Sequence, residues 1–232
     1  MAFRDNQTAS CTKCHIKFDG FNTLTQNELN TLKESNCNIE FRKGETLIKE
    51  GTRCSTIICI KKGFAKLHLK GLENKSIIIK ILKQGDIILS PGIFTDELNH
   101  FSVTAISEME TCLMKIDAFS TILRKNIQFT EQLLKLNHQI TNDLYAQLIN
   151  FSHKKMIGRV ANTILYLSQE IYGTRKFFTT LSRQDIADLS NVSKESLIRV
   201  LKDFKENNIL TIHGNMIEIT ALKTLEKISK AG

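Results

Sequence analysis

The stretch LSRQDIADLSNVSKESLIRVLKDFKENNIL, residues 181–210, carries the strongest structural signal in the chain. Ser182 precedes a short apolar segment and has Asp185 three residues after it, which is typical of the N-terminus of a helix. Ser193 begins a second helix, and the small Ala187 leaves room for the two helices to cross closely. The second helix has apolar residues spaced three or four apart, namely Leu197, Val200, Leu201 and Phe204. Two short capped helices joined by a turn of three or four residues predict a helix-turn-helix.

The outward face of the second helix carries residue types that read DNA bases. Glu195 and Arg199 lie four residues apart and therefore share one face. A carboxylate accepts a hydrogen bond from cytosine N4, and a guanidinium donates two to guanine. A solvent-exposed salt bridge between the two is the alternative; we favour base reading, with Ile198 as a third base-reading position. We expect phosphate contacts, which position the protein without reading sequence, from Ser182, Arg183, Ser193, Lys194, Ser196 and Lys202.

A helix and a hairpin flank this motif. Apolar residues at helical spacing predict a helix over residues 155–172 that ends at Gly173. Two apolar runs, residues 209–212 and 216–219, surround His213-Gly214-Asn215, which indicates a β-hairpin. Residues 151–232 carry 13 Lys or Arg against 8 Asp or Glu, so this third of the chain holds +5 of the total charge of +8. The excess favours an anionic partner.

Residues 117–151 have helical periodicity without any Pro or Gly. One helix of about 34 residues would extend roughly 50 Å, which is longer than one small domain covers. Its apolar stripe packs either on its own β-domain or on the same helix of a second chain, and the length favours the dimer. Asn137 and Gln147 near the stripe are candidates for fixing the register. The expected dimerisation residues are Leu133, Leu136, Ile140, Leu144 and Leu148.

Between residues 39 and 117 the chain alternates short β-rich runs with glycine-centred turns, which predicts an antiparallel roll. A capping box at Thr25–Glu28 predicts a short helix before it. The expected fold is α+β: an N-terminal arm with a Cys-x-x-Cys motif (1–20), a jelly-roll-like sensory β-roll (21–117), a dimerisation helix (118–151) and a winged helix-turn-helix (152–232). The expected strands lie at residues 39–42, 46–49, 55–61, 64–70, 76–82, 101–106 and 111–116.

Other classes of protein find little support in the sequence. No apolar run reaches the length of a membrane span, and the N-terminus lacks the apolar segment of a secretory signal, so we expect a cytoplasmic protein that does not interact with membranes. No nucleophile with a base at recognisable spacing, phosphate loop or His-Glu-x-x-His motif appears, so we do not expect an enzyme.

The segments RQDIA (183–187), SKES (193–196) and RVL (199–201) resemble the helix-turn-helix of the Crp/Fnr regulators, and the 209–219 hairpin resembles their wing. Upstream, Phe41-x-Lys-Gly-Glu, Glu50-Gly, Lys62-Gly and Gly85-Asp fall where the cyclic-nucleotide-type β-roll of that family has its turns. The resemblance covers nearly the whole chain.

This resemblance implies a bacterial transcription regulator that binds palindromic double-stranded DNA as a homodimer, with RNA polymerase as a further partner. In the family, the residues matching Glu195 and Arg199 read a TGA-type core in each half-site. Ile198 stands where the Fnr branch typically has serine and the Crp branch glycine, so the outer bases of the half-site stay open. The alternative function is a redox or ligand sensor that acts through a protein partner instead of DNA.

The signal that this β-roll detects is left open by the sequence. Family members that bind cyclic AMP carry Gly-Glu followed about ten residues later by Arg-Ser or Arg-Thr, because the phosphate needs a guanidinium. This chain has no arginine between Arg53 and Arg124, so we do not expect it to bind cyclic AMP. The loop that would line an effector pocket contains Gly85, Asp86, Ser90, Pro91 and Gly92.

Cysteine and histidine residues are candidate ligands for a metal or haem that would act as the sensor. Cys11 and Cys14 lie near the N-terminal cluster cysteines of the oxygen-sensing relatives, with Cys112 close to the fourth, but a third N-terminal cysteine is missing for an iron–sulfur cluster. Zinc bound by Cys11, Cys14 and His15 and haem bound by His100 are further candidates. We favour thiols without a metal in the N-terminal arm, and buried small side chains for Cys54, Cys59 and Cys112.

Overall fold

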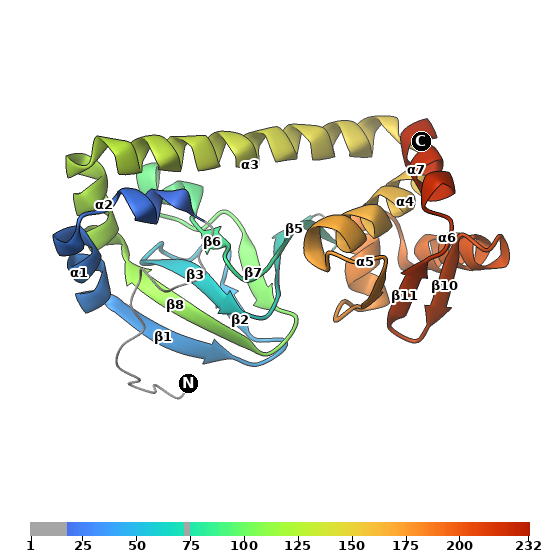
Figure 1. Ribbon diagram of the computed structural model, residues 1–232, viewed down its shortest axis with the longest axis horizontal. Coiled ribbons are helices and arrows are strands. Elements are labelled where there is room, and N and C mark those ends of the chain that lie inside the picture. Colours follow the sequence, from blue (N-terminus) through green and yellow to red (C-terminus); the bar gives the residue numbers. More distant parts are fainter. Residues whose placement is uncertain (1–17, 72–74) are drawn as a thin grey trace. The chain divides into compact units, whose positions relative to one another are not determined.

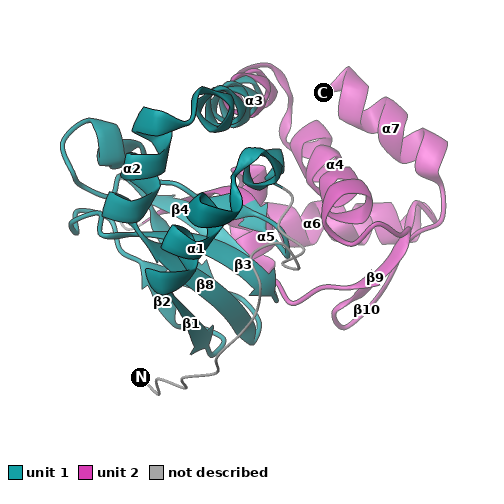
Figure 2. Cartoon of the chain, turned by 60° about the vertical axis from the view of Figure 1, so that its left-hand side comes forward, with its two compact units in different colours: residues 1–69, 81–142 teal, residues 70–80, 143–232 magenta. Residues whose placement is uncertain are grey.

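The computed structural model describes residues 18–71 and 75–232 (Figure 1). The chain divides into two compact units, one formed by residues 1–69 and 81–142 and the other by residues 70–80 and 143–232 (Figure 2). The first contains antiparallel β-sheets and the second is mainly helical, so the expected α+β class is confirmed. No helix in the described ranges has the length and apolar character required to span a membrane.

Two antiparallel four-stranded sheets form the β-roll. Their strand orders are β1-β8-β3-β6 and β2-β7-β4-β5. Each expected strand is present within a few residues, and β6 is an additional one. The strands are β1 (Asn36–Phe41), β2 (Thr46–Ile48), β3 (Thr56–Lys62), β4 (Ala65–Lys70), β5 (Ser76–Leu82), β6 (Ile87–Ile88), β7 (Ser102–Ala105) and β8 (Met109–Lys115).

Strand β3 explains how the roll joins the helices around it. Successive side chains on a strand point to opposite faces. Ile58 and Ile60 belong to the core between the two sheets, whereas Ile57 and Cys59 belong to a second core beneath helices. Because both faces are covered, β3 is a nearly continuous apolar run instead of an alternating one. The turn after it needs Gly63, which has φ +89° and where a Cβ atom would lie 2.3 Å from the Glu108 carbonyl oxygen.

The second core of this unit contains residues of several helices, including Phe129 and Leu133 of the helix at Ile127–His153. The short 3-10 helix η2 (Asp19–Thr23) leads into α1 (Gln26–Glu34), and α2 (Ile116–Lys125) follows β8. The predicted capping box of α1 is confirmed, since Thr25 accepts from the Glu28 backbone N–H and the Glu28 carboxylate accepts from the Thr25 N–H. The hydrogen bond from the Thr25 N–H is the largest of the causes that lower the pKa of the Glu28 carboxyl, and the Thr25 hydroxyl and the Asn126 side chain contribute to the same direction.

The prediction of a single helix over residues 117–151 is wrong, because the helix is interrupted. The structure has two helices, α2 and α3 (Ile127–His153), separated at Asn126. The backbone of Asn126 is extended, with φ −113° and ψ 99°, and its side-chain oxygen accepts from the Phe129 N–H. Its side-chain NH₂ group donates to the Glu28 carboxylate and to the Thr23 carbonyl. Helix α3 is continuous over 27 residues and is therefore about 40 Å long.

In the second unit, the last turns of α3 are followed by α4 (Met156–Tyr166). Helix α4 continues as the π-helical turn η5 (Leu167–Ile171), close to the expected helix at residues 155–172. It also contains a three-stranded sheet with the order β10-β11-β9. The predicted hairpin is confirmed as β10 and β11. The remaining elements are β9 (Lys176–Phe178), α5 (Arg183–Ser190), α6 (Lys194–Glu206), β10 (Leu210–His213), β11 (Met216–Ile219) and α7 (Leu222–Ala231).

Candidate DNA-binding site

Helix α5 begins and ends where the sequence predicts. The Ser182 side chain accepts from the Asp185 N–H, and the Asp185 carboxylate accepts from the Ser182 N–H at 2.9 Å. Asn191 ends the helix in the left-handed region, with φ 51°, which asparagine tolerates better than most residues. Ala187 is fully buried, consistent with a close crossing. The turn from Asn191 to Ser193 thus reverses the chain within three residues.

Helix α6 separates a buried face from an exposed face. Leu197, Val200, Leu201 and Phe204 are buried, as the apolar spacing predicts. Ser193 caps the helix by accepting from the Ser196 N–H at 3.1 Å. The opposite face is exposed at Lys194, Glu195, Ile198, Arg199 and Lys202. Such a face, at the N-terminal half of the second helix, is what enters a major groove.

Glu195 and Arg199 do not form the salt bridge that was the alternative to base reading. Within the described residues, neither side chain makes an ion pair or a hydrogen bond with another side chain. Further along the same face, the Lys202 ammonium lies 3.7 Å from the Glu206 carboxylate. Both charged groups are therefore exposed to solvent in the isolated chain, where a hydrogen-bonding partner can reach them.

Arg183 is engaged within the protein, whereas the sequence suggested a phosphate contact. Its Nη2 atom donates to the Gly214 carbonyl at the tip of the β10–β11 hairpin, 2.6 Å away. Burial lowers the pKa of the guanidinium, and its Nη1 atom has no hydrogen-bond partner among the described residues. Arg183 therefore ties the hairpin tip to the start of α5 through its Nη2 atom, while its Nη1 atom is buried.

We expect Arg183→Lys to loosen the hairpin tip while keeping the positive charge, because an ammonium cannot reproduce the planar fork of a guanidinium. The lost bond should speed backbone amide exchange at residues 211–216 by up to roughly fivefold, the effect of about 1 kcal/mol. Hydrogen–deuterium exchange followed by mass spectrometry measures this rate. Arg175→Lys, at an exposed arginine of the same unit, is the control. Equal exchange in wild type and Arg183→Lys would rule out the tie.

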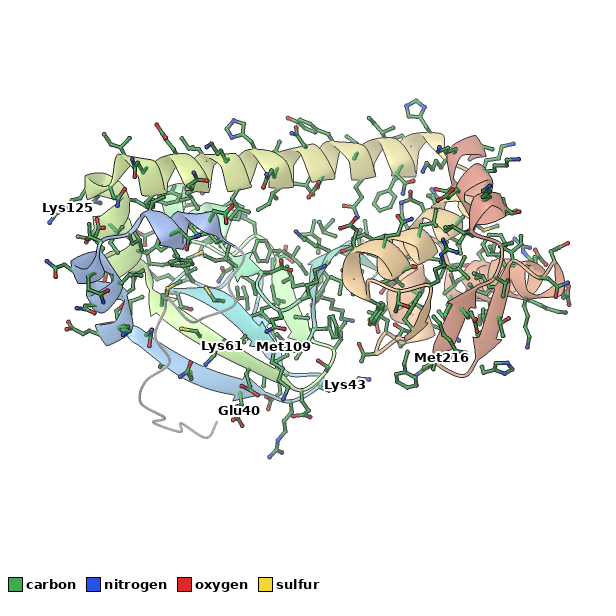
Figure 3. The ribbon with its side chains drawn as sticks, in the orientation of Figure 1. Glu40, Lys43, Lys61, Met109, Lys125 and Met216 are labelled. Atoms are coloured by element: carbon green, nitrogen blue, oxygen red, sulfur yellow. The ribbon has the colours of Figure 1, made fainter. Side chains whose placement is uncertain are left out.

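The third strand of this small sheet was not predicted. Strand β9 pairs with β11, placing Phe178 opposite Met216, which is labelled in Figure 3. Tyr172 stacks on Phe177 at 4.8 Å between ring centroids and donates a hydrogen bond to Thr179. The sequence signal for β9 is three residues long, too short to be recognised without its partner strand.

The predicted dimerisation residues of α3 fall into two groups. Leu133 is 7% exposed and belongs to the core of its own unit, and Leu136 packs against that core. These two residues therefore serve the fold of their own chain. Ile140, Leu144 and Leu148 are exposed in the isolated chain. Further exposed apolar residues on α3 are Ile127, Leu134, Tyr145 and Ile149.

The loop proposed to line an effector pocket is held by internal contacts. The Asp86 carboxylate accepts from the Lys83 N–H, and Gly85 takes φ +93° in the same turn. Pro91 and Gly92 lie in the 3-10 helix η4 (Pro91–Phe94), where a Cβ atom on Gly92 would lie 1.8 Å from the Leu98 carbonyl oxygen. Ser90 is buried. These contacts explain why the turn needs Gly85 and Asp86 and why the loop needs Gly92.

The candidate metal ligands do not come together in the described part of the chain. Cys11, Cys14 and His15 lie outside the described residues. Cys112 is buried in the core beneath the helices, directly across from Cys59 in the β3–β8 register. The His100 ring is exposed, and its Nε2 atom lies 3.0 Å from the Asp96 carboxylate. The pKa of the Asp96 carboxyl is lowered, mainly by the hydrogen bond from the Leu98 N–H and next by the hydrogen bond with His100. Among the described residues, no group of three or more His, Cys, Asp or Glu side chains is placed to hold a metal ion.

Comparison with known proteins agrees with this architecture. Residues 38–126 match the cyclic nucleotide-binding domain family, and residues 158–228 match the Crp-like helix-turn-helix domain family. The cAMP-activated global transcriptional regulator CRP of Salmonella typhimurium is 26% identical over 193 residues, which cover 80% of this chain and 90% of the relative. A CRP-like cAMP-activated global transcriptional regulator of Mycobacterium tuberculosis is 25% identical over 197 residues, 82% of this chain and 86% of the relative.

The chain belongs to the Crp/Fnr family. Solved structures support the Crp/Fnr fold. A transcriptional regulator of the crp/fnr family from Eubacterium rectale has a TM-score of 0.78 at 16% identity, covering 93% of this chain and 99% of that one. FixK2 from Bradyrhizobium japonicum has a TM-score of 0.76 at 17% identity, covering 83% of this chain and 96% of that one. As a Crp/Fnr protein, the chain is a transcription regulator with a helix-turn-helix DNA-binding domain.

Proposed function

We propose that the chain acts in the cytoplasm as a homodimer that binds a palindromic DNA site with a TGA-type core in each half. Helix α6 of each subunit reads bases through Glu195 and Arg199. The β-roll controls this binding in response to a signal other than a cyclic nucleotide, and RNA polymerase is the partner through which transcription changes.

One observation carries this proposal: Glu195 and Arg199 lie next to each other on the exposed face of α6 and are not paired with each other or with any described side chain. Opposite charges four residues apart on a helix can pair, as Lys202 and Glu206 do, but Glu195 and Arg199 do not. A carboxylate beside a guanidinium matches adjacent C and G edges in the major groove, which a TGA core and its complement provide.

The homodimer is supported by the exposed apolar side chains of α3. Leu148 and Ile149 are 64% and 60% exposed in the isolated chain, on a helix that has no other cover at those positions. Ile140, Leu144 and Leu148 repeat every four residues, which is the spacing of one helical face. A second copy of α3 would cover this face, and two-fold symmetry then matches a palindromic site.

Membership of the family does not by itself imply that this chain binds the ligand of its CRP relatives. The relatives are cAMP-activated, and a cyclic phosphate requires a cationic group at the floor of the roll. This chain has no arginine between Arg53 and Arg124, and the Asp86 carboxylate of the Gly85 turn is bonded to the Lys83 N–H. These features support a different signal.

Fluorescence anisotropy tests the function with two labelled duplexes, one carrying inverted TGA cores centred about one helical turn apart and one with the same bases scrambled. We expect nanomolar binding to the first, with the affinity falling steeply between 50 and 200 mM salt because counterions are released from phosphates. The measurement is made on protein purified in the presence and in the absence of oxygen, so that a redox signal required for DNA binding is detected. Equal binding to both duplexes in every preparation would reject base reading and favour a sensor that acts through a protein partner.

A further inference from the structure

One apolar side chain, Ile198, lies on the base-reading face of α6, at the edge of the arc that the charged residues occupy. At 100° per residue, Glu195, Ile198, Arg199 and Lys202 fall within an arc of about 100° on one side of the helix. Ile198 is 49% exposed, while the charged side chains on both sides of it extend into solvent. Among the described residues of α6, the other large apolar side chains are all buried.

The fold gives no reason for isoleucine at this position. A β-branched side chain loses rotamer freedom in a helix, so lysine, glutamate or alanine would stabilise an exposed helical position better. Single exposed apolar residues are common and need no explanation on an ordinary surface. Ile198 differs because its neighbours on the helix face are the groups proposed to contact bases.

We propose that Ile198 recognises the 5-methyl group of a thymine that flanks the TGA core in each half-site. This inference rests on the proposed function. The thymine methyl is the apolar group that the major groove of unmodified DNA offers, and apolar side chains are its usual partners. Cytosine presents an amino group in place of the neighbouring thymine oxygen and has no methyl. Ile198 thus supplies the part of the specificity that Glu195 and Arg199 leave undecided.

The size of the effect follows from burial of one methyl group. Removing such a contact weakens binding by about fourfold in each half-site. Because a dimer has two half-sites, the loss on a symmetric duplex is expected to reach about fifteenfold. A thymine-to-deoxyuridine exchange removes the methyl and leaves every hydrogen-bonding group of the base in place, so it isolates this contact.

The test begins with selection by the full-length chain from duplexes that carry inverted TGA cores with randomised flanking bases. Each thymine of the enriched site is then replaced by deoxyuridine, one symmetric pair at a time, and Kd is measured by anisotropy. We expect one flanking pair whose exchange weakens wild type about fifteenfold and leaves Ile198→Ala unchanged. Ile198→Val, which keeps a branched apolar side chain, should retain most of the difference.

Ile157→Ala is the matched control, because Ile157 is 44% exposed, is the same residue type and lies on α4 of the same unit. It should keep the full effect of the deoxyuridine exchange. An equal loss in wild type and Ile198→Ala, or no flanking thymine that needs its methyl, would overturn the inference while leaving base reading by Arg199 intact. Selection that enriches no flank and no core would instead reject the proposed function together with this inference.

Discussion

Arg199→Ala is expected to abolish the discrimination between a TGA palindrome and its scrambled counterpart. A bidentate contact between arginine and guanine contributes about 1–3 kcal/mol, and the symmetric site contains two of them. The variant should therefore bind the palindrome between about 30-fold and about 20,000-fold more weakly, until its affinity reaches that for scrambled DNA. Because Arg199 is exposed and its side chain makes no hydrogen bond or ion pair within the described residues, the melting temperature should change little.

Competition anisotropy with both duplexes measures this loss, and circular dichroism checks the fold. Lys227→Ala is the control for the lost positive charge, since Lys227 is exposed on α7 of the same unit. It should change binding to the two duplexes by equal, small factors. If Arg199→Ala keeps the ratio between matched and scrambled duplexes, α6 does not read bases and the proposed interface is wrong.

Leu148→Asp is expected to convert the protein into a monomer. The side chain is 64% exposed in the single chain, so the carboxylate remains solvated and each subunit stays folded. In a dimer the same carboxylate would be buried against its symmetry mate without a cation, which is strongly unfavourable. DNA affinity should fall by a factor of roughly 10² to 10⁴, because binding of the second half-site is no longer intramolecular.

Light scattering after size-exclusion chromatography gives the mass of wild type and variant at the same concentration. Leu148→Met, which conserves volume and apolar character, should remain dimeric and bind DNA normally. A dimeric Leu148→Asp would show that α3 does not form the subunit interface. A monomeric variant with unchanged affinity would show that the dimer is not needed for DNA binding.

The elements that the sequence predicted best are those specified by local chemistry. Ser182 and Thr25 cap the helices expected of them, because a cap depends on groups within three residues of each other. The exposed face of α6 was also predictable, because helical spacing alone decides which residues share it.

Other features depend on partners that are distant in sequence. The break at Asn126 combines a local cap, in which its side-chain oxygen accepts from the Phe129 N–H, with hydrogen bonds to Thr23 and Glu28, about a hundred residues earlier. No Pro or Gly marks this break in the sequence. Arg183 was expected to contact phosphate, but the hairpin tip 31 residues later accepts its hydrogen bond. Strand β9 exists because β11 supplies its ladder partner.

The apolar stripe of α3 shows most clearly which features local sequence predicts and which features tertiary packing decides. Periodicity alone placed Leu133 and Leu148 in one set, and nothing in their spacing separates them. The tertiary structure buries Leu133 against its own core and leaves Leu148 exposed. The sequence by itself determined the helices, their caps and the faces they present, since these follow from interactions within a few residues. Only the tertiary structure decided which apolar residues are already covered, because burial depends on which distant segments pack there.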